Sequence, residues 1–166
     1  SMPVGKQTWF GVEFDIIDPE KNNNKSILTL RGTYVTPAFP EKVLIPMRHE
    51  KVRCLYFLHS ASNGARTLIG EYIVRFASGK ESKIDNRIPG NNGNWWTGYY
   101  YDTGEESKPV GILSRSTLSG NPEWRYLRIF EWVNPYPDDI IIGVEAISNN
   151  TVATPILLGI TGVCNP

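Results

Sequence analysis

Glycine and proline recur at short, fairly regular intervals along the chain, and this spacing constrains the fold more than any other feature. The 166 residues include 15 glycines and 12 prolines, which leave no helical pattern of useful length. The runs between them are short and rich in Val, Ile, Tyr, Phe and Trp, as strands are. The sequence therefore predicts an all-β fold, with strands at Thr8–Ile16, Ser26–Tyr34, Lys42–Pro46, Val52–His59, Thr67–Ala77, Ser82–Arg87, Pro109–Ser114, Trp124–Trp132, Ile140–Ser148 and Ile156–Gly162.

Two patterns of hydrophobicity indicate how these strands are buried. In Glu71–Ala77 the side chains of Tyr72, Val74 and Phe76 point to one side of the strand while charged residues point to the other. The run Val52–Leu58 is instead apolar on both faces, which suits a central strand covered on both sides. Two packed antiparallel sheets accommodate both kinds of strand, so we expect a two-sheet antiparallel β-sandwich.

Length and charge restrict the number of domains and the classes of partner. A chain of this size normally forms one domain with a sufficient core, so we interpret residues 3–166 as a single module and Ser1 and Met2 as a cloning remnant. The chain has 17 Lys and Arg residues against 17 Asp and Glu residues, so it lacks the positive excess that nucleic acid or an anionic membrane attracts. It also has no apolar run of about 18 residues. We expect neither a nucleic-acid nor a membrane partner.

The two cysteines, Cys54 and Cys164, are too far apart for a CxxC redox or zinc motif. Cys54 lies inside an apolar run, where a free thiol behaves as a small hydrophobic side chain. We expect two free thiols, and a disulfide that closes a long loop is the alternative.

The segment from Pro89 to Gly104 is the most unusual part of the chain, because five of the seven residues from 95 to 101 are aromatic. Neighbouring Gly and Asn residues favour a loop over a regular strand. Aromatic faces pack against the C–H faces of sugar rings, and Asn, Asp and Tyr groups bind sugar hydroxyls. The segment has no Lys or Arg, which single-stranded nucleic acid would require. A neutral carbohydrate is therefore the expected ligand, and the candidate residues are Trp95, Trp96, Tyr99, Tyr100, Tyr101, Asn91, Asn94 and Asp102.

These residues also have ordinary interpretations. Tryptophan is mostly buried in proteins, so one of Trp95 and Trp96 is a candidate to fill the core. A second aromatic group shares one face of the strand Trp124–Trp132 together with Arg128, and such a face usually forms sandwich core or its rim; the members are Trp124, Tyr126, Phe130 and Trp132. Trp124 is a ligand candidate because it lies near the start of that strand. Arg87 and Arg125 are further candidates, because a planar guanidinium bridges adjacent hydroxyls, although both also suit an ordinary surface.

Motifs for catalysis are absent from the sequence, which contains no GxSxG, HExxH, GxGxxG or P-loop pattern. Nothing marks His49 or His59 as a base or a metal ligand. Carboxylates for a glycosidase pair are present without a pattern that joins two of them, and they are Glu13, Asp15, Asp85, Asp102 and Glu131. Asp15 and Asp18 are weak candidates for calcium, since their spacing misses the EF-hand pattern and turn or cap roles suit them as well.

Five segments resemble, in order, blocks of galactose-binding-like β-sandwich accessory domains attached to bacterial polysaccharide-degrading enzymes: Phe14–Asn22 with Lys25–Ser26, Leu55–His59, Asn91–Trp96, Phe130–Pro137 and Pro155–Thr161. The resemblance implies a jelly roll that does no chemistry itself, a secreted or cell-surface location, and the possibility of a structural calcium. It also implies that Arg87 lies with Asn91–Trp96 at one end of the sandwich. The Tyr99–Tyr101 run matches no block of that family.

Together these observations predict a non-catalytic carbohydrate-binding module. Its partners would be a neutral polysaccharide or oligosaccharide and a linked catalytic domain in the parent chain. Binding would raise the local substrate concentration for that enzyme, and no cofactor would be required. Two alternatives stay open: a structural accessory domain that packs against the catalytic domain, and a small glycosidase or lyase.

Overall fold

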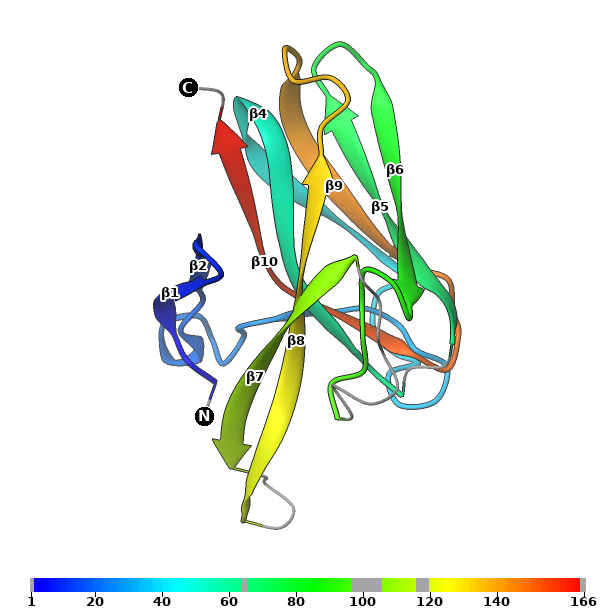
Figure 1. Ribbon diagram of the computed structural model, residues 1–166. Coiled ribbons are helices and arrows are strands. Elements are labelled where there is room, and N and C mark those ends of the chain that lie inside the picture. The colour runs from blue at the N-terminus through cyan, green and yellow to red at the C-terminus, as the bar shows by residue number, and fades with distance from the viewer. Residues whose placement is uncertain (1, 64–65, 97–105, 116–119, 165–166) are drawn as a thin grey trace.

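The structure is a computed structural model that describes residues 2–63, 66–96, 106–115 and 120–164 (Figure 1). In this part of the chain the strands are joined by loops and one short 3-10 helix, η1 (Pro19–Lys21). The strands are β1 (Gly5–Trp9), β2 (Val12–Ile16), β3 (Leu28–Thr29), β4 (Lys42–Ser62), β5 (Thr67–Phe76), β6 (Glu81–Ile88), β7 (Ser107–Arg115), β8 (Pro122–Val133), β9 (Ile140–Ser148) and β10 (Thr154–Cys164). The all-β prediction is confirmed.

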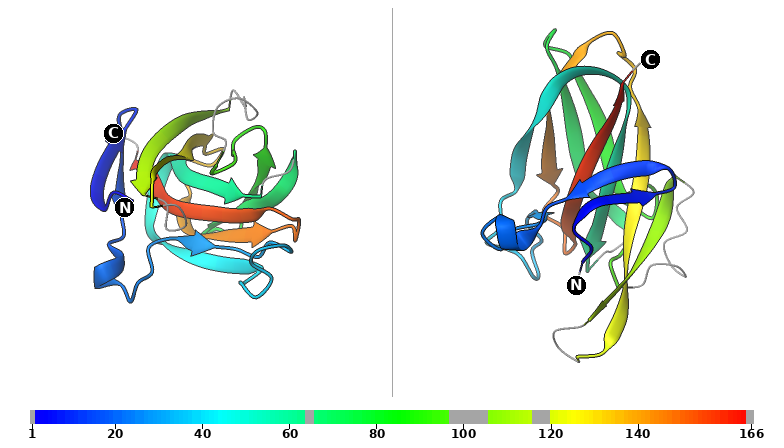
Figure 2. Two further views of the ribbon diagram at one scale, coloured as in Figure 1. Left: turned by 90° about the horizontal axis from the view of Figure 1, so that it is seen from below. Right: turned by 90° about the vertical axis from the view of Figure 1, so that its left-hand side faces the viewer.

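Two antiparallel sheets form the body of the molecule, and β4 belongs to both. The β5 sheet has the order β4–β9–β5–β6, and the β8 sheet has the order β3–β10–β4–β8–β7. The first half of β4 pairs with β9, and its second half pairs with β10 and β8. The two sheets face each other as an all-β sandwich, which the view along the strands in Figure 2 shows.

Strand β4 passes from one sheet to the other at a local irregularity of its backbone. The sequence pattern is interrupted at the same place, so the sequence predicts a break between two strands there. The register with β9 shifts between Pro46 and Glu50, and His49 has a positive φ of 25°. Such a bulge bends a strand without ending it. Lys42–Pro46 and Val52–His59, predicted as two strands, are therefore one strand that changes partners, because a proline and an irregular turn interrupt the local pattern.

The main core lies between the two sheets. Phe57 of β4 stacks on Tyr72 of β5 with ring centroids 4.6 Å apart, and Val74 lies fully buried on the same face as Tyr72. Burial of one large apolar side chain contributes roughly 1.5–3 kcal/mol. The cluster draws residues from every strand of the β5 sheet and from β4 and β10 of the β8 sheet: Leu30, Val52, Leu55, Phe57, Tyr72, Val74, Phe76, Ile84, Ile141, Val144, Ala146 and Leu157.

A second core lies on the outer side of the β8 sheet, beneath the hairpin of β1 and β2. The hairpin lies against β10 in Figure 2. The ring of Phe14 packs beside Gly159, where an added Cβ atom would lie 3.3 Å from Cδ1 of Phe14. Phe14 and Ile16 pack with Leu127 and Ile129 of β8 in this outer core. The hairpin explains why the middle strand Val52–Leu58 is apolar on both faces.

Two sequence predictions for the N-terminal region are wrong in detail. Thr8–Ile16 is not one strand, because Phe10 and Gly11 both adopt positive φ and reverse the chain between β1 and β2. Of Ser26–Tyr34 only Leu28–Thr29 is paired, through Leu157 and Ile156 of β10. Both errors have the same cause: strand propensity marks residues that suit an extended chain, but turns and pairing decide which of them form a ladder.

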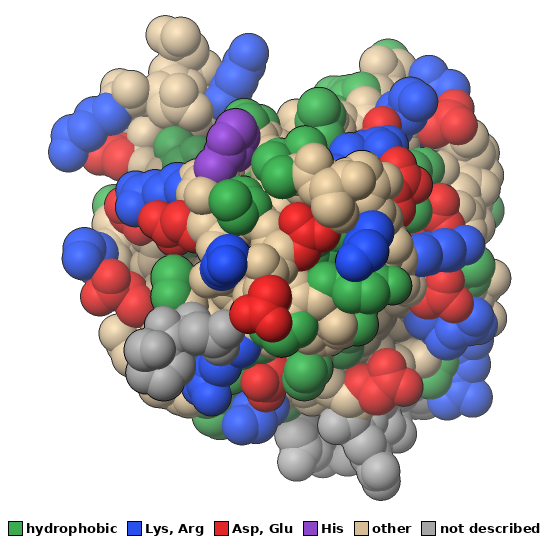
Figure 3. Space-filling view, turned by 90° about the horizontal axis from the view of Figure 1, so that it is seen from above, with side chains coloured by type: hydrophobic (Ala, Val, Ile, Leu, Met, Phe, Trp, Pro, Cys, Tyr) green, Lys and Arg blue, Asp and Glu red, His purple; other side chains and the backbone are tan. Residues whose placement is uncertain are grey.

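The outer face of the β5 sheet carries a row of ion pairs. Arg75 joins Glu145 at 2.7 Å and also contacts Glu81, and the Lys83 ammonium lies 2.5 Å from Glu71. The molecule seen from above likewise mixes acidic and basic side chains, in keeping with the zero net charge (Figure 3). In the part of the chain that the structure describes, no helix is long and apolar enough to cross a membrane.

Candidate functional site

The first part of the aromatic segment, residues 89–96, is a loop that connects the two sheets at one end of the sandwich; we name it the Trp loop. Strands β4 and β8 pair as far as His59 and Arg128 and then separate. The loop fills the resulting gap. Ala61 of β4 donates its backbone N–H to the Gly93 carbonyl at 3.0 Å, and its own carbonyl accepts from Trp95 at 2.7 Å. The carbonyl of Trp95 accepts from the backbone N–H of Tyr126 in β8 at 3.0 Å. Backbone pairing on both sides therefore holds the loop like a short inserted strand.

The backbone of the loop passes close to the side chain of Arg128 at Gly93, and this close approach lets the loop fit into the gap. A Cβ atom at this position would lie 2.7 Å from Nε of Arg128, whose side chain is buried. A separation this short is a steric clash, so only glycine lets the loop backbone pass beside that guanidinium. Glycine is therefore required in this segment for close packing at Gly93, and not only for the turns that glycine favours.

Asn91 and Asn92 hold the Trp loop from inside. Asn91 is only 4% exposed; its amide oxygen accepts from the backbone N–H of Arg87 at 3.0 Å, and its amide nitrogen donates to the carbonyl of Asp85. Asn92 is fully buried, donates to Oδ1 of Asn86 at 2.8 Å and accepts from the N–H of Gly93. The prediction that Asn91 contacts the ligand is therefore corrected: its side chain satisfies buried backbone groups, and it does not reach the surface.

His59 links the same loop to the main core. Its Nε2 lies 2.7 Å from the carbonyl oxygen of Asn91, and its Nδ1 lies 3.0 Å from the hydroxyl of Tyr72. A carbonyl only accepts, so Nε2 carries the hydrogen and Nδ1 accepts from the tyrosine. Burial lowers the pKa of His59 to about 4, and the nearby charge of Arg128 acts in the same direction, whereas the bond to Asn91 opposes them. Burial also raises the pKa of Tyr72, so both groups stay neutral at ordinary pH.

The two tryptophans of the loop have different surroundings. Trp95 is half-buried and packs against the outer core, so the expectation that one of the two rings fills the core is met by Trp95. Trp96 is 48% exposed. Its backbone N–H donates to Oδ1 of Asn94 at 3.0 Å, which fixes the chain just before the ring. Trp96 is thus the described ring of this loop that presents a large surface to solvent.

Arg125 of β8 lies under the ring of Trp96. Its guanidinium carbon is 3.8 Å from the ring centroid, a close cation–π contact. The guanidinium also donates to Oε2 of Glu123 at 2.6 Å and to the carbonyl of Trp124 at 3.0 Å. Arg125 is only 6% exposed, because the indole and its own strand cover it. The predicted role of Arg125 is changed by this placement: it supports Trp96 from below and has little surface of its own for a ligand.

On the opposite face of β8, Trp124 and Tyr126 lie over β7. Side chains alternate along a strand, so these two rings point away from the side that carries Arg125. A Cβ atom at Gly111 would lie 3.2 Å from Cε3 of Trp124 and 3.7 Å from Cε1 of Tyr126, so both rings lie against this glycine. Trp124 is 54% exposed, whereas Tyr126 is half-buried. The predicted shared face of β8 exists, with Phe130 packed on the main core at its far end.

Of the predicted site residues not yet placed, the structure describes Arg87. Arg87 is an exposed residue of β6 and lies 3.5 Å from Asp85 in the ion-pair row of the β5 sheet. Tyr99, Tyr100, Tyr101 and Asp102 lie outside the described residues.

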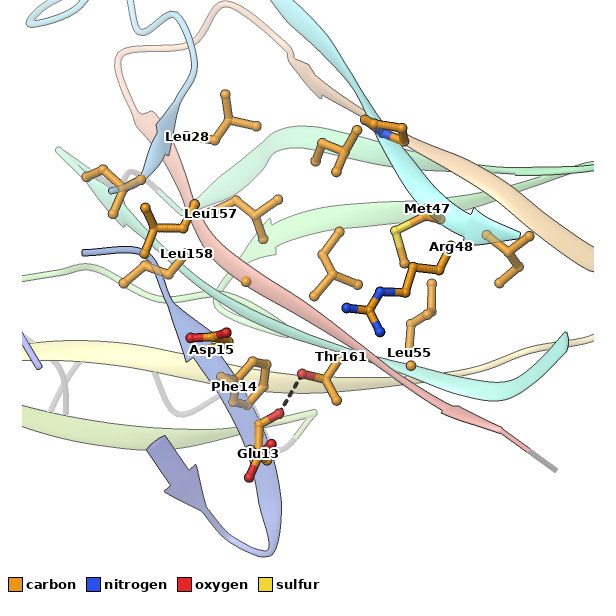
Figure 4. A pocket seen from close by; sticks show the side chains of 18 of the residues that line it. Glu13, Phe14, Asp15, Leu28, Met47, Arg48, Leu55, Leu157, Leu158 and Thr161 are labelled. Atoms are coloured by element: carbon orange, nitrogen blue, oxygen red, sulfur yellow. Dashed lines mark hydrogen bonds between the residues drawn. The ribbon is translucent and has the colours of Figure 1, made fainter. Parts of the chain in front are cut away.

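The structure also shows a groove of about 690 Å³ that the sequence did not indicate (Figure 4). It opens between β2, β10 and the bulge of β4, with Leu157 on one side and Met47 and Arg48 on the other. Thr161 in its wall donates to the carbonyl of Glu13 at 2.7 Å. Among the described residues that line it, Phe14 is the one aromatic residue, and its side chain is buried. Residues distant in sequence form it, which is why no local pattern could reveal it.

The described carboxylates considered for catalysis or calcium are distributed over β2, β6, β8 and the start of η1. Glu13 and Asp15 lie on β2 beside the groove, Asp85 lies in the ion-pair row and Glu131 lies on β8. Asp18 caps η1 by accepting from the N–H of Glu20 at 3.0 Å. Among the described residues, no group of three or more His, Cys, Asp and Glu side chains is arranged to hold a metal ion.

Both cysteines are free thiols, Cys54 buried and Cys164 exposed. This agrees with the expectation from the sequence. A comparison of the chain with protein-family models, with curated proteins and with solved structures finds no match.

Proposed function

We propose that this protein is a non-catalytic carbohydrate-binding module that binds a neutral polysaccharide at Trp96. The observation that carries the proposal is the exposed indole of Trp96 stacked at 3.8 Å on the nearly buried guanidinium of Arg125. Contact of the apolar indole with water is unfavourable. Here Arg125 covers one face of the Trp96 ring, so the opposite flat face is held toward solvent. A sugar ring can cover that face with its C–H groups.

The supports of Trp96 make it a rigid platform. Glu123 and the carbonyl of Trp124 fix the guanidinium of Arg125, and Asn94 fixes the backbone of Trp96. A ring that is already fixed loses less conformational entropy on binding, which favours affinity. Rigidity of this kind is expected of a binding surface and is not needed for a ring that only caps the core.

Charge favours a neutral ligand. Arg125, the cation beneath the ring, already forms an ion pair with Glu123 at 2.6 Å. The sequence between Ile88 and Ser107 contains no Lys or Arg and three acidic residues. A polyanion would meet no uncompensated positive charge along this segment, whereas a neutral sugar requires none.

The proposed role extends to the parent protein. A module of this kind keeps a tethered catalytic domain near an insoluble or dilute substrate and so acts through effective concentration. A jelly-roll connectivity, a galactose-binding-like ancestry, a secreted or cell-surface location and a linked glycoside hydrolase belong to this proposal. They rest on the five resembling segments of the sequence.

The test is a titration of the protein with soluble neutral polysaccharides, namely xyloglucan, galactomannan, arabinoxylan and mixed-linkage β-glucan. We expect saturable binding to at least one polymer by isothermal calorimetry and a change in tryptophan fluorescence. Trp96→Ala should weaken binding at least tenfold while circular dichroism stays unchanged. The matched control is Tyr34→Ala, which removes an aromatic ring that is 78% exposed elsewhere on the molecule.

Three results would overturn the proposal. Equal loss of binding in the Trp96 and Tyr34 variants would show that Trp96 is not the platform. Release of reducing ends from the polymer, abolished by substitution of a single carboxylate such as Glu13 or Glu131, would show an enzyme. Absence of binding to all four polymers, and to charged pectin and alginate as well, would leave a structural accessory domain.

A further inference from the structure

The β7–β8 hairpin carries exposed aromatic surface on both of its faces. Trp96 covers Arg125 on one face, and Trp124 lies on the other, since neighbouring residues of β8 point in opposite directions. In both views that show it from the side, the hairpin extends beyond the other strands (Figures 1 and 2). We propose that the Trp124 face is a second sugar-binding surface, so that one molecule binds two segments of polysaccharide at once. This inference rests on the proposed function.

Glycine at position 111 shapes this second surface. It pairs with Tyr126 across the two strands, and the six-membered ring of Trp124 lies 3.2–3.3 Å from the position that a Cβ atom would take. With no side chain between the ring and the β7 backbone, the indole can lie down on the sheet. One ring face then packs on the backbone and the other stays open, since Trp124 is 54% exposed. A larger residue at 111 would force the ring out of this position.

Leu113 and Tyr126 extend the surface around Trp124. Leu113 is directly opposite Trp124 in the register and is 53% exposed, and Tyr126 follows two residues along β8. A rise of about 3.4 Å per residue places the two rings roughly 7 Å apart along the strand. The result is a strip of two aromatic rings and one aliphatic side chain, long enough to contact neighbouring sugar units of one chain.

The charge of this face favours the same ligand class as Trp96. From Ser107 to Leu113 and from Trp124 to Phe130, the residues that share the face include no carboxylate, and their single cation, Arg128, is only 4% exposed. An acidic or basic partner would find no complementary charge there. A neutral sugar needs none, and its C–H faces match the flat rings.

The two surfaces cannot serve one short oligosaccharide, because the strand itself lies between them. A ligand on Trp96 and a ligand on Trp124 are therefore separate molecules, or separate segments of one long polymer. With a polymer, the second contact becomes intramolecular and raises the apparent affinity without a new kind of interaction. Two contacts on different polymer chains would crosslink them.

Calorimetry with short ligands tests the proposal, and the probes are cellohexaose, xylohexaose, mannohexaose and laminarihexaose. For the hexasaccharide that binds, we expect about two binding equivalents per chain, falling to about one in Trp124→Ala and in Trp96→Ala, and no binding in the double variant. Gly111→Val, which keeps Trp124 but displaces its ring, should also leave about one equivalent. Circular dichroism and melting temperature confirm that each variant is folded.

The outcomes separate this inference from the proposed function. The second surface is overturned if the protein binds one equivalent of ligand, Trp96→Ala abolishes this binding, and Trp124→Ala and Gly111→Val leave it unchanged. The proposed function then remains intact. A single equivalent that both tryptophan variants abolish means one site spanning the hairpin and also overturns it. Binding by no hexasaccharide and no polymer overturns both. In polymer solutions, the unsubstituted protein should increase the viscosity because it crosslinks polymer chains. Trp124→Ala, compared at the same molar concentration of binding sites, should not.

Discussion

Nε2 of His59 lies 2.7 Å from the carbonyl oxygen of Asn91, so a fully buried imidazole in the core holds the loop that presents Trp96. The hydroxyl of Tyr72 satisfies the other ring nitrogen at 3.0 Å. Core packing and the candidate binding surface are therefore joined by the hydrogen bond from Nε2, and protonation of Nδ1 would place a charge at a fully buried position. This arrangement has a consequence for acid stability.

Stability should fall as the solution becomes acidic through the pKa values of His59. Burial lowers the pKa of this group to about 4 in the folded protein, against an ordinary value near 6.5 in the unfolded chain. The unfolded state binds the proton first, so the contribution is complete above pH 6.5 and is lost as pH falls through about 4. The difference is worth about 3 kcal/mol. Urea unfolding between pH 7 and pH 4 measures it.

The matched variants for this prediction are His59→Gln and His49→Gln. His59→Gln removes the buried titrating group, so the free energy of unfolding should change much less between pH 6.5 and pH 4. His49→Gln removes an exposed histidine and should keep the dependence of the native protein. An unaltered pH dependence in His59→Gln would contradict the assignment.

Substitution of Arg125 by lysine should weaken sugar binding without unfolding the protein. Lysine keeps the charge but lacks the planar group that stacks on Trp96, and the contact is worth about 1 kcal/mol, or about fivefold in Kd. Arg87→Lys is the control, because Arg87 pairs with Asp85 in the ion-pair row, whereas the guanidinium stacked on Trp96 is that of Arg125. Calorimetry with the polymer that binds measures both. If Arg87→Lys lost more affinity for the polymer than Arg125→Lys, Arg87 would have to be assigned to the ligand site.

Asn92→Ala should destabilise the protein by about 2 kcal/mol, because it leaves buried polar groups without partners. The amide of Asn92 binds Asn86 at 2.8 Å and the N–H of Gly93 at 2.7 Å, and both bonds are buried. Asn149→Ala is the control, since that exposed amide makes only a 3.4 Å bond to the carbonyl of Leu68. Chemical unfolding should place the control within about 0.5 kcal/mol of the native protein. Equal losses in the two variants would refute the structural role of Asn92.

The two thiols should react with a disulfide reagent at different stages. Cys164 is exposed and should react in the folded protein, whereas Cys54 is buried. Burial raises the pKa of both thiols, so access decides the difference, and Cys54 should react only after unfolding. Ellman's reagent, added before and after guanidinium, counts the thiols. Rapid reaction of the folded Cys164→Ser variant would show that β4 or β10 opens readily.

The strands themselves could be predicted well from the sequence. The alternation of Tyr72, Val74 and Phe76 predicts β5, and all three side chains are buried on one face in the structure. The double-sided apolar run of β4 predicts a central strand, and it lies between the main core and the N-terminal hairpin. These predictions succeed because side-chain direction in a strand depends only on position along it.

The candidate site could be predicted only in part. Aromatic enrichment correctly marks a loop with one exposed ring, Trp96, but residue type cannot separate it from Trp95, which packs inward. Asn91 has the composition of a surface turn and is nevertheless buried, because the backbone of β6 needs its amide. Arg87, Trp124 and Trp96 look equivalent as candidates until packing assigns them to different faces.

The amino-acid sequence by itself determined an all-β chain, the approximate position of its strands, the two-faced burial of β4 and the concentration of rings near Trp96. Only the tertiary structure decided that β4 joins both sheets, that Arg125 supports Trp96, and that Trp124 lies on the other side of the same strand. The physical reason is the sequence separation over which each effect acts. Strand propensity and alternation depend on residues that are near neighbours in the chain, whereas burial depends on contacts with residues of β2, β6 or β10 that are distant in the sequence.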